Sequence, residues 1–141
     1  MPRDFQPSAE WRARMEHDCG CALPAEAREA IALFNAGEYY KQHDALEALW
    51  AATESPVREL YRAILQIGIA YYHVEGGNWR GALKMLDRGL RWADFAPETC
   101  QGVDVEALRR NARRLRRAIA EAGPDRLDTV DRALLTPVPM V

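Results

Sequence analysis

The sequence predicts an all-α, single-domain bundle of about five to six helices arranged as packed αα-hairpins. Its 141 residues suit one domain with its own core, and a composition of 48% hydrophobic and 28% charged residues excludes wholesale disorder. Apolar residues recur at helical spacing between glycine and proline breaks. No segment alternates polar and apolar residues with β-branched enrichment, so we expect no strands.

Helix start and stop signals place the elements in order. Proline suits the first turn of a helix and glycine suits its C-terminal end. Pro24 and Gly37 mark the first clear helix in this way. The expected helices cover residues 24–37, 38–53, 56–74, 78–93, 104–123 and, as a short one, 126–135. The expected organisation is therefore an irregular segment 1–23, with at most two helical turns, a helical domain 24–135, and a proline-containing tail 136–141.

Two stretches of the sequence echo each other at an offset of 40 residues. Gly37-Glu38-Tyr39 and Gly77-Asn78-Trp79 each place a glycine and then an early aromatic residue between two helices. This pattern favours two αα-hairpins. The helix at 56–74 is apolar on both flanks, so we expect it to be central and buried.

No targeting signal or membrane span is expected. The longest apolar run, residues 63–74, contains Gln66 and His73 and is too short to cross a bilayer. We expect a cytoplasmic protein with no membrane partner. The three cysteines do not form an even disulfide framework, so we expect no disulfide bond. The segment His17-Asp18-Cys19-Gly20-Cys21 has residue types that bind metals, but its cysteine spacing is tighter than in a zinc ribbon.

Polar side chains on two neighbouring helices predict one pocket. His43 falls in the apolar arc of the helix at 38–53, and Glu47 follows one turn later at the edge of that arc. The next helix carries one polar stripe: Glu59, Arg62, Gln66 and His73. An unpaired buried polar group costs about 1–3 kcal/mol, so we expect this stripe to face the polar edge of the helix before it. His43, Glu47, Gln66 and His73 would then share a pocket.

This pocket has two interpretations. The first is a buried hydrogen-bond network that fixes how the helices pack. The second is a ligand or metal site, because two histidines and one carboxylate are a known zinc ligand set that leaves a position for water. His43, Glu47 and His73 would then hold a divalent metal ion or act as acid and base, and Gln66 would orient a small-molecule substrate. Short metalloprotease and di-iron motifs are absent from the sequence.

Residues 34–50 resemble the signature of a small helical family, domain of unknown function 309, which runs Phe-Asn-x-Gly-x-Tyr-Phe-Glu-x-His-Glu-x-Leu-Glu-x-Leu-Trp. Residues 61–83, with Gln66 and His73, resemble its second block, and residues 102–105 resemble its closing Gly-Ile-Asp motif. The resemblance covers about residues 28–110 and implies an all-helical fold. The activity of the family is uncharacterised, and some members carry the label of metal-dependent hydrolase.

The sequence departs from the family pattern at three positions. Lys41 and Asp44 stand where the family usually has glutamate, and Arg62 replaces a frequent glutamine. A lysine in place of a ligand carboxylate would weaken cation binding through like charge.

A second candidate surface lies on the helix at 104–123. Beside its apolar stripe this helix carries Arg109, Arg110, Arg113, Arg114, Arg116 and Arg117. These arginines form either a solvated face or a surface that contacts an acidic protein or nucleic acid. The formal net charge of −2 and the absence of stacking aromatics beside them argue against nucleic acid.

Two function hypotheses follow. One is a pocket-bearing helical protein, with metal-assisted hydrolysis as its sharpest form. The other is a non-catalytic interaction module that uses the arginine face. Both are compatible with a homo-oligomer.

Overall fold

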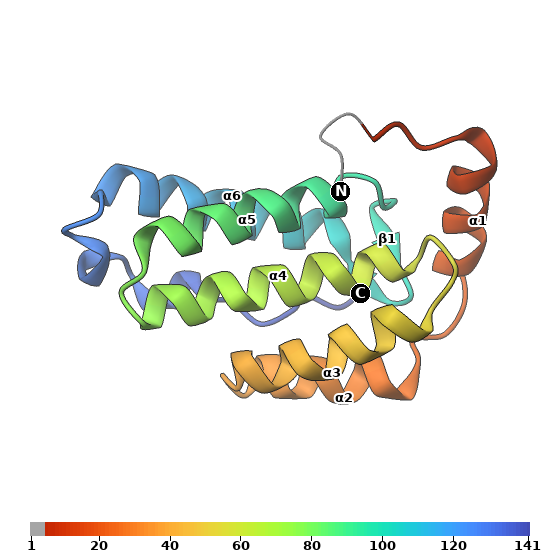
Figure 1. Ribbon diagram of the computed structural model, residues 1–141, viewed down its shortest axis with the longest axis horizontal. Helices are drawn as coiled ribbons and strands as arrows, with labels where there is room; N and C mark the ends of the chain where they lie inside the picture. The colour runs from red at the N-terminus through yellow and green to blue at the C-terminus, as the bar shows by residue number, and fades with distance from the viewer. Residues whose placement is uncertain (1–4) are drawn as a thin grey trace.

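Helices account for most of the computed structural model, which describes residues 5–141 (Figure 1). The helices are α1 (Ala9–Cys19), α2 (Ala25–Asn35), α3 (Tyr39–Ala52), α4 (Arg58–Glu75), α5 (Trp79–Ala93) and α6 (Val105–Ala122). A two-residue hairpin, β1 (Thr99–Cys100) and β2 (Val103–Asp104), precedes α6, and two 3₁₀ turns, Leu127–Thr129 and Arg132–Leu134, follow it. The all-α prediction is confirmed.

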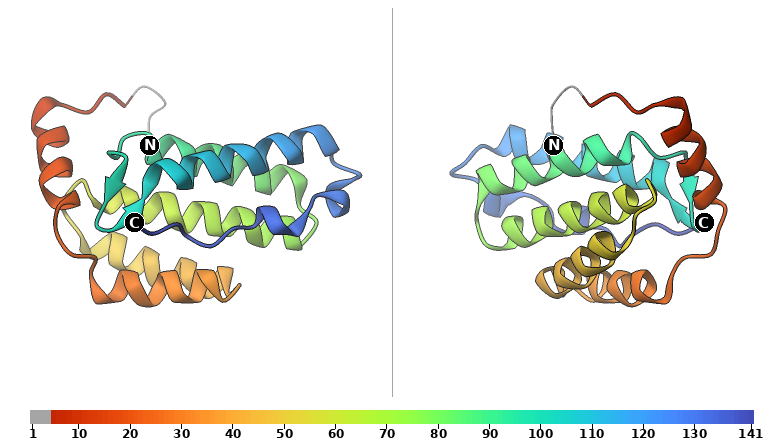
Figure 2. Two further views of the ribbon diagram at one scale, coloured as in Figure 1. Left: turned by 180° about the vertical axis from the view of Figure 1, so that it is seen from behind. Right: turned by 45° about the vertical axis from the view of Figure 1, so that its right-hand side comes forward.

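The central element is α4, as its two apolar flanks predict. It lies between α5 on one side and α3 on the other, while α2 packs on α3 and α6 packs on α5 (Figures 1 and 2). Leu60, Ile64 and Ile67 on α4 are fully buried. Gly89 lets α5 approach closely, because a Cβ atom there would lie 3.1 Å from the carbonyl oxygen of Ala63 on α4.

Two αα-hairpins confirm the echo in the sequence. Gly37 ends α2 with a φ of 81° and Gly77 ends α4 with a φ of 75°, and glycine adopts this left-handed conformation without steric cost. The chain then reverses at once into α3 and α5. The same turn therefore builds the α2–α3 hairpin and the α4–α5 hairpin.

The segment before residue 24 is more regular than expected. Ser8 caps α1 by accepting a hydrogen bond from the backbone N–H of Trp11, and the helix runs eleven residues to Cys19. The ring of Phe5 packs against those of Trp11, Trp92 and Phe95, which fixes this end of the chain to the end of α5. Residues 1–4 of the predicted irregular segment lie outside the described residues.

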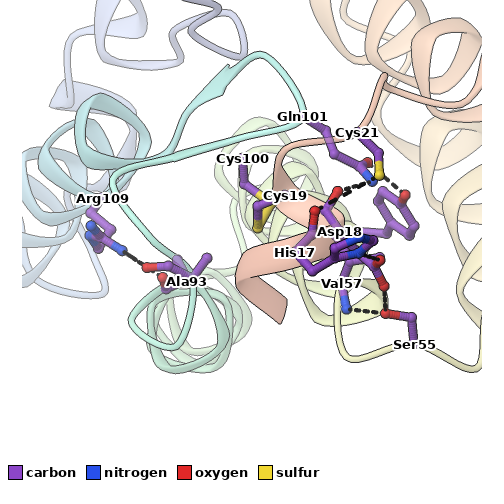
Figure 3. The surroundings of a disulfide bond; sticks show 12 residues. His17, Asp18, Cys19, Cys21, Ser55, Val57, Ala93, Cys100, Gln101 and Arg109 are labelled. Atoms are coloured by element: carbon purple, nitrogen blue, oxygen red, sulfur yellow. Dashed lines mark hydrogen bonds and ion pairs between the residues drawn. A yellow bond between two sulfur atoms is a disulfide. The ribbon is translucent and has the colours of Figure 1, made fainter. Parts of the chain in front are cut away.

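Three expectations need correction. The structure contains a short antiparallel hairpin where no strands were expected, since strands of two residues are too short to show alternation. The expected helix at 126–135 consists of two 3₁₀ turns. The prediction of no disulfide is wrong: Cys19 and Cys100, 81 residues apart, form one, and only Cys21 is free (Figure 3).

The disulfide joins α1 to β1, and hydrogen bonds reinforce this connection (Figure 3). The backbone N–H of Gln101 donates to the carbonyl of Cys19 at 2.7 Å. The side chain of Gln101 donates to the carbonyl of Asp18 at 3.1 Å and accepts from the hydroxyl of Tyr61 at 2.7 Å. The end of α1 is therefore tied to the hairpin and to α4.

Residues 136–141 form an extended segment that is anchored along its length (Figure 2). The N–H of Val138 donates to the Asn35 side chain at 2.9 Å. The N–H of Asp104 donates to the Pro139 carbonyl at 2.9 Å, and the N–H of Val141 donates to the Gly102 carbonyl at 2.8 Å. Among the described residues, no helix is long and apolar enough to cross a membrane.

Candidate functional site

The polar stripe of α4 begins with a buried ion pair. The Glu59 side chain is only 5% exposed, and its carboxylate lies 3.2 Å from Nη2 of Arg62. The same carboxylate accepts a hydrogen bond of 2.8 Å from the indole Nε1 of Trp50 on α3. A buried carboxylate must be paired in this way to remain ionised at modest cost. The first residue of the stripe, Glu59, therefore faces α3, where its partner is Trp50.

Arg62 lies between two tryptophan rings. Its guanidinium carbon is 4.4 Å from the ring centre of Trp50 on α3 and 4.3 Å from that of Trp92 on α5. Both contacts are within the range of cation–π attraction. Burial lowers the pKa of Arg62, and the charge of Glu59 opposes this effect. The two rings and the carboxylate together hold the guanidinium in one place between α3 and α5.

Gln66 lies beside α5, in a depression of about 270 Å³. The other lining residues are Arg62, Arg88, Arg91 and Trp92. The Oε1 atom of Gln66 is shielded from solvent and has no hydrogen-bond partner among the described residues. Neither predicted histidine lines this depression.

His43 lies on the outer side of α3, between two carboxylates. Its Nε2 is 3.5 Å from Glu47 Oε2, and its Nδ1 is 3.4 Å from Asp44 Oδ1. The imidazole is 29% exposed, while the side chains of Glu47 and Asp44 are 60% and 69% exposed. This group is a surface cluster within one turn and a half of helix.

His73 lies at the end of α4, beside the turn into α5. Its Nδ1 is 3.3 Å from the Asn78 side chain, and burial lowers the pKa of the imidazole. Two tyrosine rings lie between His73 and His43. The ring centre of Tyr40 is 6.0 Å from the ring centre of His43 and 5.5 Å from the ring centre of Tyr72. The ring centres of Tyr72 and His73 are 5.8 Å apart. The two histidines are therefore ends of a row of rings and do not touch.

The structure thus divides the predicted site. His43 and Glu47 are together on α3, Gln66 faces the arginines of α5, and His73 contacts Asn78. Their catalytic and metal-binding roles stay predictions. Tyr40 and Tyr72 are 56% and 45% exposed, and their exposure has no signal in the sequence, because aromatic residues at helical spacing are normally core residues.

Two groups of three side chains within residues 5–141 could hold a metal ion. They are His43, Asp44 and Glu47 on α3, and His17, Asp18 and Cys21 at the end of α1. In each group, one donor atom from every residue lies within 4.8 Å of the others. Nitrogen and oxygen donors suit zinc. The ligand set expected from the sequence fits only in part, because Asp44 occupies the place that was expected for His73.

The arginines of α6 fall into two classes. Arg109 donates to the carbonyls of Ala93 and Ala96, at 2.6 and 3.2 Å. Arg113 binds Asp94 at 3.0 Å, and Arg116 pairs with Asp87. These three hold α6 against α5 and the residues that follow it.

The remaining arginines of α6 are exposed. Arg110, Arg114 and Arg117 form no ion pair with any residue of the described chain. With Glu106, Arg109 and Arg113 they line an open depression of about 400 Å³. We call Arg110, Arg114 and Arg117 the outer arginines.

Charge is distributed unevenly over the molecule. Helices α5 and α6 together contain ten basic and three acidic residues, whereas α2 and α3 contain two basic and four acidic residues. The net charge of −2 therefore conceals a basic side and an acidic side. Such a distribution orients a charged partner toward one side.

Several residues of the motif at 34–50 have a role in the fold. Phe34, Tyr39 and Tyr71 pack their rings edge to face in the core, with centres 5.3–5.6 Å apart. Asn35 holds the tail, and Trp50 binds Glu59 and Arg62. Among the described residues, the charged contacts of His43 are with Asp44 and Glu47, and its ring lies beside that of Tyr40.

Fold and surfaces together define a small helical-bundle domain that bears a basic side and an exposed histidine–carboxylate cluster. Residues 27–85 match the family model described as Domain of unknown function (DUF309). An uncharacterized protein of Aquifex aeolicus (strain VF5) is 23% identical over 83 residues, which are 58% of this chain and 25% of that protein. The resemblance predicted from the sequence is confirmed over the matched residues, and the chain spans about a quarter of the length of this relative.

Proposed function

We propose that this domain is a non-catalytic interaction module that binds an acidic segment of a partner protein through α6. The observation that carries the proposal is the set of outer arginines. Arg110, Arg114 and Arg117 recur at helical spacing on one face and have no acidic partner among the described residues. Guanidinium groups bind carboxylates in a bidentate geometry, so aspartate and glutamate side chains are their natural ligands.

An acidic polypeptide fits this surface better than a nucleic acid does. The depression on α6 is lined by charged side chains alone, with no aromatic ring on which a base could stack. The acidic side formed by α2 and α3 would repel a long phosphate backbone. In the Aquifex aeolicus relative, the matching region is a quarter of a longer protein, as expected of a module that works beside other segments.

The test uses a fluorescent oligoglutamate peptide and the variant Arg110→Glu/Arg114→Glu. Exposed ion pairs contribute about 0.2–1 kcal/mol each, and reversing two charges turns attraction into repulsion, so we expect at least about tenfold weaker binding. Binding of the wild type should weaken as salt rises. The matched control is Arg28→Glu/Lys41→Glu, which changes the net charge equally on the acidic side.

Three results decide between the alternatives. Loss of binding in the α6 variant alone supports the proposal. Equal loss in the control variant would mean that only net charge matters and would refute it. Tighter, salt-sensitive binding of a DNA or RNA oligonucleotide than of the peptide would assign the surface to nucleic acid instead.

A metal-assisted hydrolase is the second candidate function. It is favoured by the cluster of His43, Asp44 and Glu47, whose donor atoms lie within 4.8 Å of one another. A divalent ion held there would act as a Lewis acid and lower the pKa of bound water. The exposed positions of both carboxylates argue for weak binding.

Zinc titration by calorimetry tests this candidate. The protein should carry no histidine tag, and His17→Ala/Cys21→Ser should be the background, because it removes the second metal-ligand group. We expect His43→Ala to abolish zinc binding in this background and His73→Ala to leave it unchanged. Zinc binding that persists in the His43→Ala variant would exclude a metal site on α3.

A further inference from the structure

We propose that the depression between α4 and α5 is a binding site for a phosphate group, either inorganic phosphate or a phosphate monoester. It is a different surface from the outer arginines of α6. Three guanidinium groups, those of Arg62, Arg88 and Arg91, line it, and no carboxylate does. Arg62 is paired with Glu59, whereas Arg88 and Arg91 are two neighbouring like charges without an acidic partner among the described residues, and an anion between them would relieve their repulsion.

Two of these guanidinium groups are available to a ligand. Arg88 and Arg91 are exposed and form no ion pair or side-chain hydrogen bond with any residue of the described chain. Both lie on the side of α5 that faces the α4 depression, whereas Asp87 and Asp94 pair with α6. The neighbouring acidic residues are therefore already engaged elsewhere.

The third guanidinium group is held in advance. Arg62 is fixed between the rings of Trp50 and Trp92 and is paired with the buried Glu59. A donor that is already ordered loses little conformational entropy when a ligand binds. Glu59 itself does not line the depression, so its charge positions Arg62 without occupying the site.

Gln66 adds an amide group to the lining of the depression. Its Oε1 is shielded from solvent and has no donor among the described residues, which costs about 1–3 kcal/mol. The Nε2 group of the same side chain is not shielded in this way and has no hydrogen-bond partner among the described residues, so it can donate to an anion in the depression without rearrangement.

Size and chemistry favour phosphate among anions. A depression of about 270 Å³ accommodates one small group and excludes a long polyanion. A phosphate monoester is close to a dianion at neutral pH and presents three oxygens, which matches the guanidinium forks in charge and number. A carboxylate supplies half the charge and two oxygens.

Calorimetry with inorganic phosphate, phosphoserine and adenosine monophosphate at constant ionic strength tests the proposal. We expect saturable binding of at least one of the three, with the strongest ligand showing whether the phosphate is free or borne by a peptide or a nucleoside. The variant Arg88→Ala/Arg91→Ala should weaken binding at least tenfold. Gln66→Glu, which keeps the size of the side chain and adds a negative charge, should abolish it.

The control variant is Arg80→Ala/Lys84→Ala, which removes the same charge from two other exposed positions of α5. Unchanged binding in this variant supports the assigned site, and circular dichroism confirms that all variants fold. The proposal fails if the wild type binds none of the three ligands, or if the Arg88→Ala/Arg91→Ala variant binds them as the wild type does. The Arg110→Glu/Arg114→Glu variant should keep its phosphate affinity, so failure here is separable from failure of the peptide proposal.

Discussion

Replacing Cys19 and Cys100 with alanine should lower the free energy of unfolding by about 2–4 kcal/mol. The bond joins residues 81 positions apart, so it restricts most of the unfolded chain. For a loop of this length, the chain-entropy relation gives an upper value of about 4.5 kcal/mol at room temperature. Measured effects usually fall below this value, because reduced chains retain some structure.

Urea denaturation followed by circular dichroism measures this change. Wild type, the Cys19→Ala/Cys100→Ala variant, and wild type with reductant should be compared, with Cys21→Ser as the control. Cys21 is exposed, so its replacement should change stability by less than about 0.5 kcal/mol. An unfolding midpoint that does not move on reduction or on double substitution would refute the reasoning. A large change in the Cys21→Ser variant would show that the bonded pair is wrongly assigned.

Three further predictions concern the core and pH. Gly68→Ala should lower the free energy of unfolding by about 1–3 kcal/mol in urea denaturation, because the new Cβ would lie 2.8 Å from Cδ of the fully buried Gln42. Hydrogen bonding from Ser55 lowers the pKa of Asp18, so Ser55→Ala should raise that pKa in a carbon-13 NMR titration. The stability gained from ionised Asp18 is present above about pH 4 and is lost as the pH falls through the lowered pKa of the folded state, so the two proteins should converge in stability in acid. Burial lowers the pKa of His73, so the unfolded state binds more protons below about pH 6.5 and stability should fall there. Urea denaturation above and below that pH should show a smaller change in the free energy of unfolding for His73→Gln than for the wild type. An equal change in the two proteins would mean that the pKa of His73 is the same in the folded and the unfolded state.

Local signals predicted the parts of the fold that depend on neighbouring residues. Gly37 and Gly77 define both helical hairpins, since each requires a left-handed backbone within a few residues of a helix end. The disulfide could not be predicted in this way, because Cys19 and Cys100 are 81 positions apart and four helices, α2 to α5, separate them in the chain. The residues around Cys19 do not indicate which distant segment it contacts.

The candidate site was predicted in part for a related reason. Helical periodicity places Glu59, Arg62 and Gln66 on one polar stripe of α4, but it does not predict which neighbouring helix each of these side chains contacts. The helix α4 has a neighbour on each side. Glu59 turns to Trp50 on α3, whereas Gln66 turns to Arg88 and Arg91 on α5. Assigning all four polar side chains to the α3 side was therefore the error in the pocket prediction.

The hairpin before α6 is the place where both described ends of the chain are secured. The covalent bond of Cys19 fastens α1 to β1, and the carbonyls of Pro139 and Gly102 fasten the last residues to β2 and the turn. A change that loosens the hairpin is thus transmitted to segments more than a hundred residues apart in the chain. On reduction of the bond, the backbone amides of α1, of Asp104 and of Val141 should begin to exchange with solvent at the same rate, as one cooperative unit.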